Sequence, residues 1–480
     1  MDDMAEELEE SDMEQLTLYL RLFGFDKTGE PELEDVEDEY GWARLPDILL
    51  EEIFAMLTPK ARHQASRVCK SWYKTFYSPR VWDTFLFEEG TLTRRRYNLF
   101  KGFTRELCPR KAQSCLNNVG SLFKKISIRP ISDFYNLLFL GVLSSFLSFF
   151  EEFPMPMLHT FQFTFACESR GINGNMIYGT GGQILQELNT LIACMKNLKT
   201  LSISHLLLAE EDVPGLFDAA LRYNSESVRF LEIVNCAKAD TPIPQLAKFD
   251  CLQRLTVSNQ HVDDEVAILL AGTGLSDLRL VQDKYTCATE PVSADAWRVI
   301  KDIAPYLKVT LEVRGKCKNS LLLQPHAPVA SIVFDTPYSK ISHGDAMDIV
   351  HFYRKTLEVF IQKGIPRVHG SRSFHERGDS SFLMMVKNCP KLKTLVINER
   401  LSTATVLLLS HESKSLETFL VRANAIIKRA DWPRDREWSE EFYRNLRTNA
   451  RCYDRMSDEV AQKHDWKWRP LSDREFKQMI

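Results

Sequence analysis

The residue types that most often carry chemistry are present in this 480-residue chain, but their spacing forms no known catalytic pattern. The glycine-rich stretch "YGTGG" at 178–182 has the composition of a phosphate cradle, yet it lacks a preceding strand and the spacing of a phosphate-binding loop. The sequence holds no Walker-type lysine, no HExxH and no G-x-S-x-G, and its eleven histidines are isolated. We therefore expect no catalytic residue, no cofactor and no enzymatic activity.

The eleven cysteines also form no recognisable site. They are scattered, without the C-x-x-C pairs or paired Cys/His spacing that structural zinc sites use. We interpret them as reduced, apolar residues and expect no metal. The N-terminal "MDDMAEELEE" has no apolar run behind a basic start, so no secretory signal is expected. These features predict a cytoplasmic or nuclear location, or both.

One short stretch, "RVCKSWYKTFYSPRVW" at 67–82, interleaves aromatic residues with four basic ones. Such a stretch could stack nucleic-acid bases, or it could belong to a small helical module that buries its rings and exposes its charges. The whole chain has a net charge of -4, which gives no global attraction to nucleic acid. We favour the helical module and expect no nucleic-acid partner.

Two helices are expected in this region. Residues 44–58 have helical apolar spacing, and Pro46 suits a first helical position. Most of the apolar side chains form one broad arc, but Ile48 lies on a second, smaller arc, which predicts packing against two surfaces. Thr58-Pro59 predicts the N-cap and first position of a helix that runs to about Tyr77. A module of about 40 residues rarely buries enough surface to be stable alone, so the next domain and a partner protein are expected to cover it.

The combined spacing of these residues resembles an F-box over about a twelfth of the chain. The matching motif residues are Leu45, Pro46, Ile53, Phe54, Leu57, Val68, Cys69, Lys70, Trp72, Val81 and Trp82. Asp47-Ile48 stands where many members carry Glu, and Thr58–Ala61 replaces an acidic residue and Leu in the inter-helix turn. These departures are expected to change the affinity for a partner, but they leave the apolar residues of the motif in place.

The resemblance implies that residues 44–85 bind a Skp-type adaptor, which links to a cullin and a ubiquitin-charged conjugating enzyme. The residues expected at this contact or in the core beneath it are Leu45, Pro46, Ile48, Leu49, Ile53, Phe54, Leu57, Val68 and Trp72. The sequence does not separate the two roles.

From residue 120 onward, a pattern of apolar-x-x-apolar-x-apolar recurs. The copies begin at residues 123, 158, 198, 228, 252, 275, 307, 329, 357, 392 and 416, with one extra residue in the copy at 307 and a poor copy at 357. Helical patterns lie between them, and this alternation is the leucine-rich-repeat signature. The match is loose, because the Asn or Cys that usually follows the strand occurs at Cys236 and Asn424 alone. An ordinary open parallel sheet is the alternative.

The predicted fold class is therefore α/β: a small all-helical F-box followed by a curved leucine-rich-repeat-like solenoid, in which short parallel strands alternate with helices. In each strand, the residue between the last two apolar positions is expected on the solvent-facing inner side. In the early copies these residues are all polar: Ser127, Gln162, Ser202, Glu232, Thr256 and Arg279.

In the last copies the corresponding residues are Val333, Val396 and Leu420, and apolar side chains in an exposed row mark an interface. They are expected to contact either the substrate or the tail of the chain. We favour the tail, because end repeats need a cover. The residues with helical spacing there are Trp438, Phe442, Tyr443 and Leu446.

Three further stretches have unusual composition. Residues 134–150 carry no charge, but they fall short of the roughly 20 residues of a spanning helix, so a buried helix and no membrane are expected. Residues 93–111 are basic and are interpreted as a solvated linker, with a localisation or phosphate-contacting patch as the alternative. Residues 1–40 hold sixteen acidic and two basic residues, which predicts a disordered arm. Its apolar segment "EQLTLYLRLF" is expected to dock at an unidentified place.

The expected organisation has five parts: an acidic, largely disordered arm at 1–40, the F-box at 41–86, a linker or helical connector at 87–120, the repeat domain at 121–425 and a helical cap or tail at 426–480. We expect the substrate-recognition adaptor of a Skp–cullin–F-box type ubiquitin ligase, whose repeats hold an unknown protein substrate. The alternative is a leucine-rich-repeat scaffold that binds partners without recruiting a ligase.

Overall fold

The computed structural model describes residues 45–99, 102–132, 134–150, 152–165, 168–170, 176–178, 182–317, 320–366, 373–464 and 467–479. The chain divides after Val228 into two compact units. The acidic stretch predicted as an arm at 1–40, with its apolar segment, lies outside the described residues, as does most of the glycine-rich stretch at 178–182.

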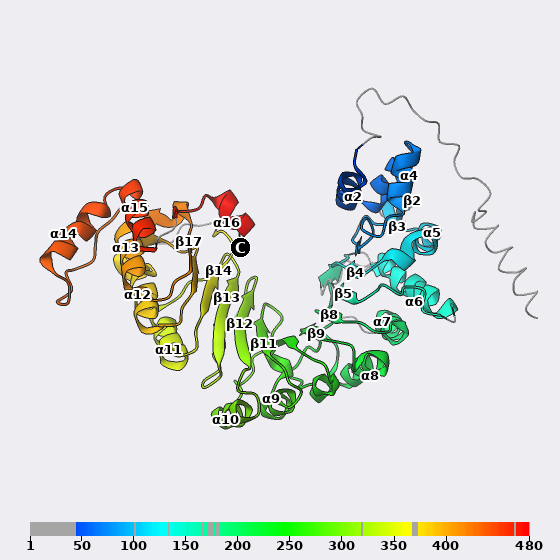
Figure 1. The fold of residues 1–480 in the computed structure, drawn as a ribbon. Helices are drawn as coiled ribbons and strands as arrows, with labels where there is room; N and C mark the ends of the chain where they lie inside the picture. The colour runs from blue at the N-terminus through cyan, green and yellow to red at the C-terminus, as the bar shows by residue number, and fades with distance from the viewer. Residues whose placement is uncertain are drawn as a thin grey trace, which may run out of the picture. The chain divides into compact units, whose positions relative to one another are not determined.

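The described part of the first unit begins with three short helices, α2 (Asp47–Met56), α3 (Pro59–Ala65) and α4 (Lys70–Phe76) (Figure 1). The Thr58 hydroxyl accepts a hydrogen bond from the Ala61 amide at 3.3 Å, which confirms the predicted N-cap of α3. The single helix predicted as far as Tyr77 is wrong, because the chain leaves the helix after Ala65 and restarts from an extended Cys69. The Ser66 hydroxyl donates to the His63 carbonyl oxygen at 2.8 Å, a local bond that competes with helix continuation.

The strands of the first unit form a parallel sheet. In order of pairing they are β1 (Thr84–Phe87), β4 (Lys125–Ile128), β5 (Thr160–Thr164) and β8 (Thr200–Ser204). One face is covered by α5 (Pro109–Val119), α6 (Phe139–Phe149), α7 (Gly182–Cys194) and α8 (Val213–Asn224) (Figure 1). This sheet therefore starts at β1, well before residue 121, where the repeat was predicted to begin.

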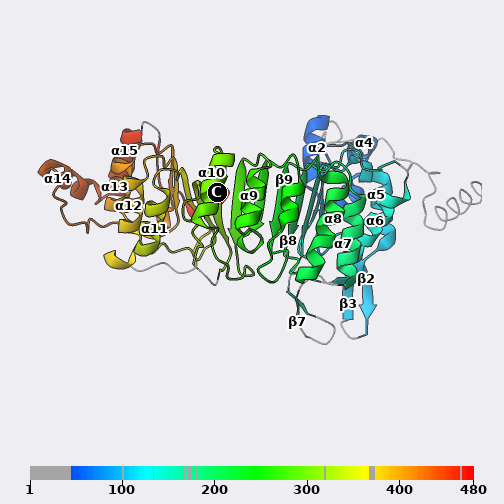
Figure 2. The same ribbon diagram turned by 90° about the horizontal axis from the view of Figure 1, so that it is seen from below.

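The basic stretch at 93–111 forms secondary structure, which differs from the solvated linker predicted for it. It contains an antiparallel hairpin of β2 (Thr93–Asn98) and β3 (Gly102–Leu107), and then the start of α5. A second, shorter hairpin pairs β6 (Glu168–Arg170) with β7 (Met176–Tyr178). Figure 2 shows the β2–β3 hairpin extending beyond helices α7 and α8 of this unit.

The uncharged stretch at 134–150 contains α6, which buries one apolar face, as the sequence predicted, while Phe149 at its end is exposed. Its buried apolar residues are Phe139, Leu140, Leu143 and Leu147. Within the described ranges, no helix is both long enough and apolar enough to cross a membrane.

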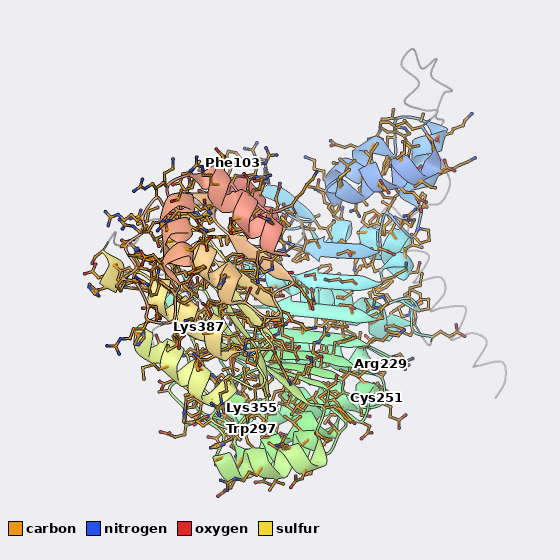
Figure 3. The ribbon with its side chains drawn as sticks, turned by 60° about the vertical axis from the view of Figure 1, so that its left-hand side comes forward. Phe103, Arg229, Cys251, Trp297, Lys355 and Lys387 are labelled. Atoms are coloured by element: carbon orange, nitrogen blue, oxygen red, sulfur yellow. The ribbon has the colours of Figure 1, made fainter. Side chains whose placement is uncertain are left out.

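The second unit contains a longer parallel sheet. Its strands, in order of pairing, are β9 (Phe230–Val234), β10 (Arg254–Ser258), β11 (Asp277–Gln282), β12 (Lys308–Arg314), β13 (Val329–Asp335), β14 (Val359–Gln362), β15 (Thr394–Ile397) and β17 (Thr418–Val421). One face is covered by α9 (Asp264–Ala271), α10 (Ala294–Ile303), α11 (His343–Tyr353), α12 (Asp379–Asn388) and α13 (Thr403–Glu412) (Figure 1). Trp297 of α10, labelled in Figure 3, is buried beneath this helical layer.

Each of the eleven apolar patterns found in the sequence forms a strand of one of these sheets. Within each unit, successive strands of the sheet pair in chain order without reversal. A doubly wound open sheet reverses its strand order at a switch point. The order seen here is instead consistent with a solenoid-like repeat.

The chain after β17 is mainly helical. Its elements are β18 (Ile426–Ile427), which pairs with β16 (Leu401–Ser402), and helices α14 (Glu440–Asn449), α15 (Tyr453–His464) and α16 (Asp473–Met479). Helix α15 packs on α13, and Met456 and Val460 of α15 are buried. Of the tail residues with helical spacing, Trp438 and Leu446 are buried.

Candidate functional site

The three N-terminal helices bury one set of apolar side chains. Phe54 and Trp82 are 1% and 2% exposed, and Phe76 lies between them in the chain at 7%. The ring of Trp82 meets Phe76 edge-on at 5.2 Å between centroids, and its Nε1 donates to the Phe76 carbonyl oxygen at 2.6 Å. Trp82 also approaches Phe123, which precedes β4, at 6.0 Å. The helices therefore rest on the sheet domain of the first unit, which supplies part of their cover.

A buried arginine links the helices of this module. Arg62 of α3 donates from Nε to the Phe54 carbonyl oxygen at 2.9 Å and from Nη2 to the Ala55 carbonyl oxygen at 2.7 Å. Its guanidinium also lies over the Trp82 ring, 4.7 Å from the centroid. Because these carbonyl groups belong to the last turn of α2, Arg62 satisfies helix-end acceptors while it stacks on an aromatic ring. The geometry fixes α2 relative to α3.

A second set of apolar side chains in the same module faces solvent. Ile48 is 59% exposed, Leu49 46%, Met56 78% and Val68 51%. Large apolar side chains that gather on one small module, rather than being scattered singly, mark an interaction site. The structure thus divides the predicted residues into core and surface.

The exposure of each predicted contact residue assigns it to the core or to the surface of the module. Phe54 is buried, Pro46, Ile48, Leu49 and Val68 are exposed, and Leu45, Ile53, Leu57 and Trp72 are half-buried. The half-buried Trp72 meets Phe54 edge-on at 5.8 Å between centroids. The helical spacing places Met56 on the same apolar arc as Leu49, about 20° away at 100° per residue, but Met56 was not among the predicted contact residues.

In the second unit, the apolar inner-face positions lie near the tail. Val396 is 2% exposed and packs with Leu471 and Phe476, and Leu420 and Ile361 are partly buried against the same cluster. Val333 is also buried and lies beside Ile361 across the pairing of β13 with β14. The tail segment around α16 therefore covers Val396 and Leu420 on the face opposite the helices (Figure 1).

The tail also closes the edge of the sheet beside β17. Leu471 donates its amide to the Val421 carbonyl oxygen at 2.9 Å, and its own carbonyl accepts from the Ala423 amide at 2.8 Å. Trp468 stacks on Phe419 at 5.5 Å and donates from Nε1 to the Phe419 carbonyl oxygen at 2.7 Å. An unpaired edge strand is a template for aggregation, and these contacts cover it.

Replacing Leu471 and Phe476 together with alanine is expected to expose the inner face at Val396 and Leu420. Losing a buried Phe alone costs about 3–5 kcal/mol, so the double variant should show a lower melting temperature and stronger apolar-dye fluorescence. Met479→Ala in the same helix is the control, because that side chain is 63% exposed. Equal dye binding by the double variant and the control would rule out the tail as the cover.

Polar side chains on the inner face of the second unit form an ion network. Arg314 contacts Glu232 at 2.8 Å and Glu312 at 2.9 Å, and Glu312 also contacts Arg279 at 2.9 Å. Burial alone would raise the pKa of the Glu312 carboxyl, but Arg314 and Arg279 together hold it below its usual value. These four residues satisfy one another, so this part of the inner face offers little unpaired charge to a partner.

Two adjoining pockets lie beyond the carboxyl ends of the strands β12 to β17. One has a volume of about 220 Å³ and the other about 200 Å³, and Tyr338, Ser339 and Lys340 line both. The walls of the first contain the charged side chains Lys340 and Asp345 and the apolar side chains Val313, Leu321, Leu323, Phe334, Ile341 and Ile349. The charged side chains that line the second are Lys340, Glu376, Arg377, Glu399, Arg400 and Arg422.

The loops that form these pockets are closely packed. Gly364, after β14, has a φ of +78°, and a Cβ there would lie 2.9 Å from the backbone nitrogen of Pro337. Glu399 accepts hydrogen bonds from Gln362 at 2.5 Å and from the Ile341 amide at 2.9 Å. Burial raises the pKa of the Glu399 carboxyl to about 7 despite these bonds. The pocket walls are therefore held in place by contacts among three neighbouring loops.

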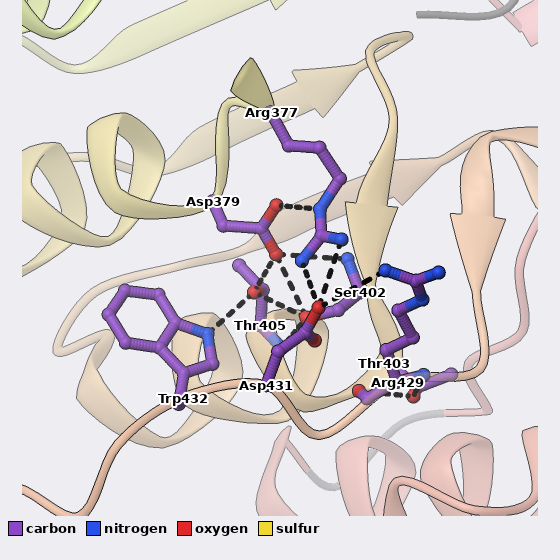
Figure 4. A network of polar contacts seen from close by, with 8 residues as sticks. All are labelled: Arg377, Asp379, Ser402, Thr403, Thr405, Arg429, Asp431 and Trp432. Carbon is purple, nitrogen blue, oxygen red and sulfur yellow. Dashed lines mark hydrogen bonds and ion pairs between the residues drawn. The ribbon is translucent and has the colours of Figure 1, made fainter. Parts of the chain in front are cut away.

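A buried polar network supports the second pocket (Figure 4). Arg377, whose side chain is fully buried, contacts Asp379 at 2.6 Å and Asp431 at 3.1 Å. Asp379, also fully buried, accepts from the Ser402 amide at 3.0 Å and the Ser402 hydroxyl at 2.8 Å, and from the Thr405 hydroxyl. The network ties the start of α12 to the start of α13 and to the chain after β18.

The buried ring of His261 has a structural partner at each of its nitrogens. His261 accepts at Nε2 from the Cys236 amide at 3.0 Å, and its Nδ1 lies 2.9 Å from the Thr241 carbonyl oxygen. Burial lowers the pKa of His261 to about 4 and raises that of the Cys236 thiol to about 12, so neither is suited to proton transfer or nucleophilic attack at neutral pH. No cluster of His, Cys, Asp and Glu able to hold a metal occurs within the described ranges.

Comparison with known proteins agrees with the reading of the N-terminal helices. Residues 42–84 match the F-box domain, so the chain contains an F-box at its three-helix module. No curated protein sequence matches the chain. Among solved structures, the complex of Rad7 and Elc1 in yeast is similar at 12% identity, with a TM-score of 0.39, over 82% of this chain and 92% of that one.

Proposed function

We propose that this protein is the substrate-recognition adaptor of a Skp–cullin–F-box type ubiquitin ligase. The observation that carries the proposal is the set of exposed apolar side chains Ile48, Leu49, Met56 and Val68 on an F-box whose buried aromatic side chains include Phe54 and Trp82. A partner of the Skp type, expected from the F-box, would cover this surface. Burial of four such side chains would supply several kcal/mol towards binding, at roughly 25 cal/mol per Å² of apolar area before the costs of association.

The proposed place of the target is the pair of pockets at the strand ends of the second unit. Apolar and charged side chains together line these pockets, which suits a protein segment that presents an apolar side chain next to a polar one. The leucine-rich-repeat character of the domain is part of the same proposal, supported by the strand order and the helices on one face. In this mechanism the chain contributes no reacting group and acts by holding its target near the conjugating enzyme.

A pull-down with the full-length chain tests this role. We expect wild type to recover a Skp-type adaptor and a cullin, and Leu45→Ala/Pro46→Ala to lose both, because the entry to α2 is part of the matched motif. If folded wild type recovers neither, the ligase role is wrong and the alternative of a scaffold without ligase recruitment holds. If the variant still recovers the adaptor and the cullin, the start of α2 does not contribute to adaptor binding.

A further inference from the structure

The β2–β3 hairpin presents an unusual surface. In its register Arg95 lies opposite Arg105, and Tyr97 lies opposite Phe103. Because side chains alternate along a strand, these four residues share one face of the hairpin. Tyr97 is 61% and Phe103 71% exposed, and Leu99 beyond them is 86% exposed.

This face combines apolar area with like charges placed side by side. The Arg95 guanidinium lies 5.5 Å from the Phe103 ring centroid, and Tyr97 meets Phe103 at 5.3 Å between centroids. Like charges directly opposite each other destabilise a strand pair, so the Arg95–Arg105 pairing is a cost that an anionic partner would remove. Residues 93–111 contain seven basic residues and one acidic residue, Glu106. A partner that fits must be both acidic and partly apolar.

A segment with that composition exists in the same chain. The net charge of -4 is the sum of -14 from residues 1–40 and +10 from residues 41–480. Within residues 1–40, the stretch 14–23, "EQLTLYLRLF", is apolar and lies between acidic runs. The arm therefore complements the hairpin face in charge and in apolar character.

We propose that residues 1–40 dock on the hairpin face formed by Arg95, Tyr97, Phe103 and Arg105. About 20 residues separate the apolar stretch from α2, and an extended chain of that length spans up to about 70 Å. A tethered segment acts at an effective concentration in the millimolar range, so even a weak contact is largely occupied and outcompetes free polyanions. The docked arm thereby masks a basic surface that would otherwise attract nucleic acid or anionic lipid.

Photo-crosslinking in the full-length chain tests the docking. With p-benzoylphenylalanine in place of Tyr97, we expect intramolecular crosslinks to residues 1–40, concentrated at 14–23. The yield should fall at least tenfold in Arg94→Gln/Arg95→Gln/Arg105→Gln, and it should fall at high salt because the exposed charges are screened. The matched control, Lys301→Gln/Arg354→Gln/Lys355→Gln, removes three exposed cations from the second unit and should leave the yield unchanged; Lys355 is labelled in Figure 3.

A second site and a second readout make the result decisive. The same photo-crosslinker at Tyr306, which is 89% exposed in the second unit, should give no crosslink to residues 1–40. Crosslinks from position 97 to other segments, to a second copy of the chain, or to nothing would overturn the proposal. It would also be overturned if full-length wild type bound single-stranded RNA or phosphatidylserine vesicles through the hairpin as tightly as a variant with the acidic residues of 1–40 changed to amides.

Discussion

Asp379→Ala is expected to destabilise the second unit by about 3–5 kcal/mol, because it leaves the guanidinium of Arg377 buried with one remaining carboxylate partner. The carboxylate of Asp379 has no contact with solvent and accepts from Arg377, Ser402 and Thr405. Its removal therefore leaves several buried donors without an acceptor, and each such donor is costly to leave unsatisfied. Urea denaturation followed by tryptophan fluorescence measures the change, with amide hydrogen exchange in α13 as a local readout.

The matched control for this prediction is another Asp–Arg pair on the surface. Asp295 contacts Arg298 at 2.5 Å, but these side chains are 86% and 69% exposed. Exposed ion pairs contribute about 0–1 kcal/mol, so Asp295→Ala should barely change the denaturation midpoint. Equal shifts for the two variants would mean that the buried network does not hold α12 and α13 together.

Ile48→Glu/Leu49→Glu is expected to weaken binding of a Skp-type adaptor by at least about 100-fold, since buried apolar anchors at interface centres each contribute about 1–2 kcal/mol or more. Both side chains are exposed in the structure, so the fold of the F-box should be kept. Burying an unpaired carboxylate against the partner adds a further cost. Binding to the purified adaptor measures the loss, and the melting temperature checks that the variant is folded.

The control places the same substitutions on another exposed apolar surface. Leu269 and Ile303 of the second unit are 44% and 48% exposed, close to the values for Leu49 and Ile48. Leu269→Glu/Ile303→Glu should leave adaptor affinity within about twofold of wild type, because neither residue belongs to the F-box. If both double variants lost affinity alike, the N-terminal apolar surface would not be the specific contact.

The spacing of apolar residues along the sequence predicted much of this fold. Every segment with the apolar-x-x-apolar-x-apolar pattern forms a strand, because in a parallel strand those positions are buried against the covering helices. The same spacing in Trp82-Asp83-Thr84-Phe85-Leu86-Phe87 also marks β1, although Trp82 is at the same time a residue of the F-box motif. Trp82 belongs to two hydrophobic cores, because its ring contacts Phe76 of the three-helix module and Phe123 of the sheet domain.

Other features depend on tertiary geometry that local pattern does not contain. The break between α3 and α4 depends on a hydroxyl bond at Ser66, and it turns Val68 outward while Cys69 points inward. Leu49 is exposed and the adjacent Leu50 is buried, although both belong to the apolar arc of α2. The network around Asp379 joins residues more than 50 positions apart, from Arg377 to Asp431, and no spacing rule connects them.

Two rows of inner-face residues meet at strand β12. Strand β12 has seven residues, and Thr310 pairs with Arg279 while Glu312 pairs with Val333. The inner-face residues of the early copies and those of the late copies therefore form two separate rows, and the rows are two residues apart along the strand. The change from polar to apolar character along the face reflects this shift as well as the cover supplied by the tail.

The most direct test of the account is calorimetric titration of the purified full-length chain with a purified Skp-type adaptor. We predict saturable one-to-one binding with a negative heat-capacity change, because apolar side chains leave water on association. The signal should disappear when Ile48 and Leu49 are changed to glutamate. A folded wild-type chain that shows no saturable binding, or binding that the double variant retains in full, would contradict the central claim.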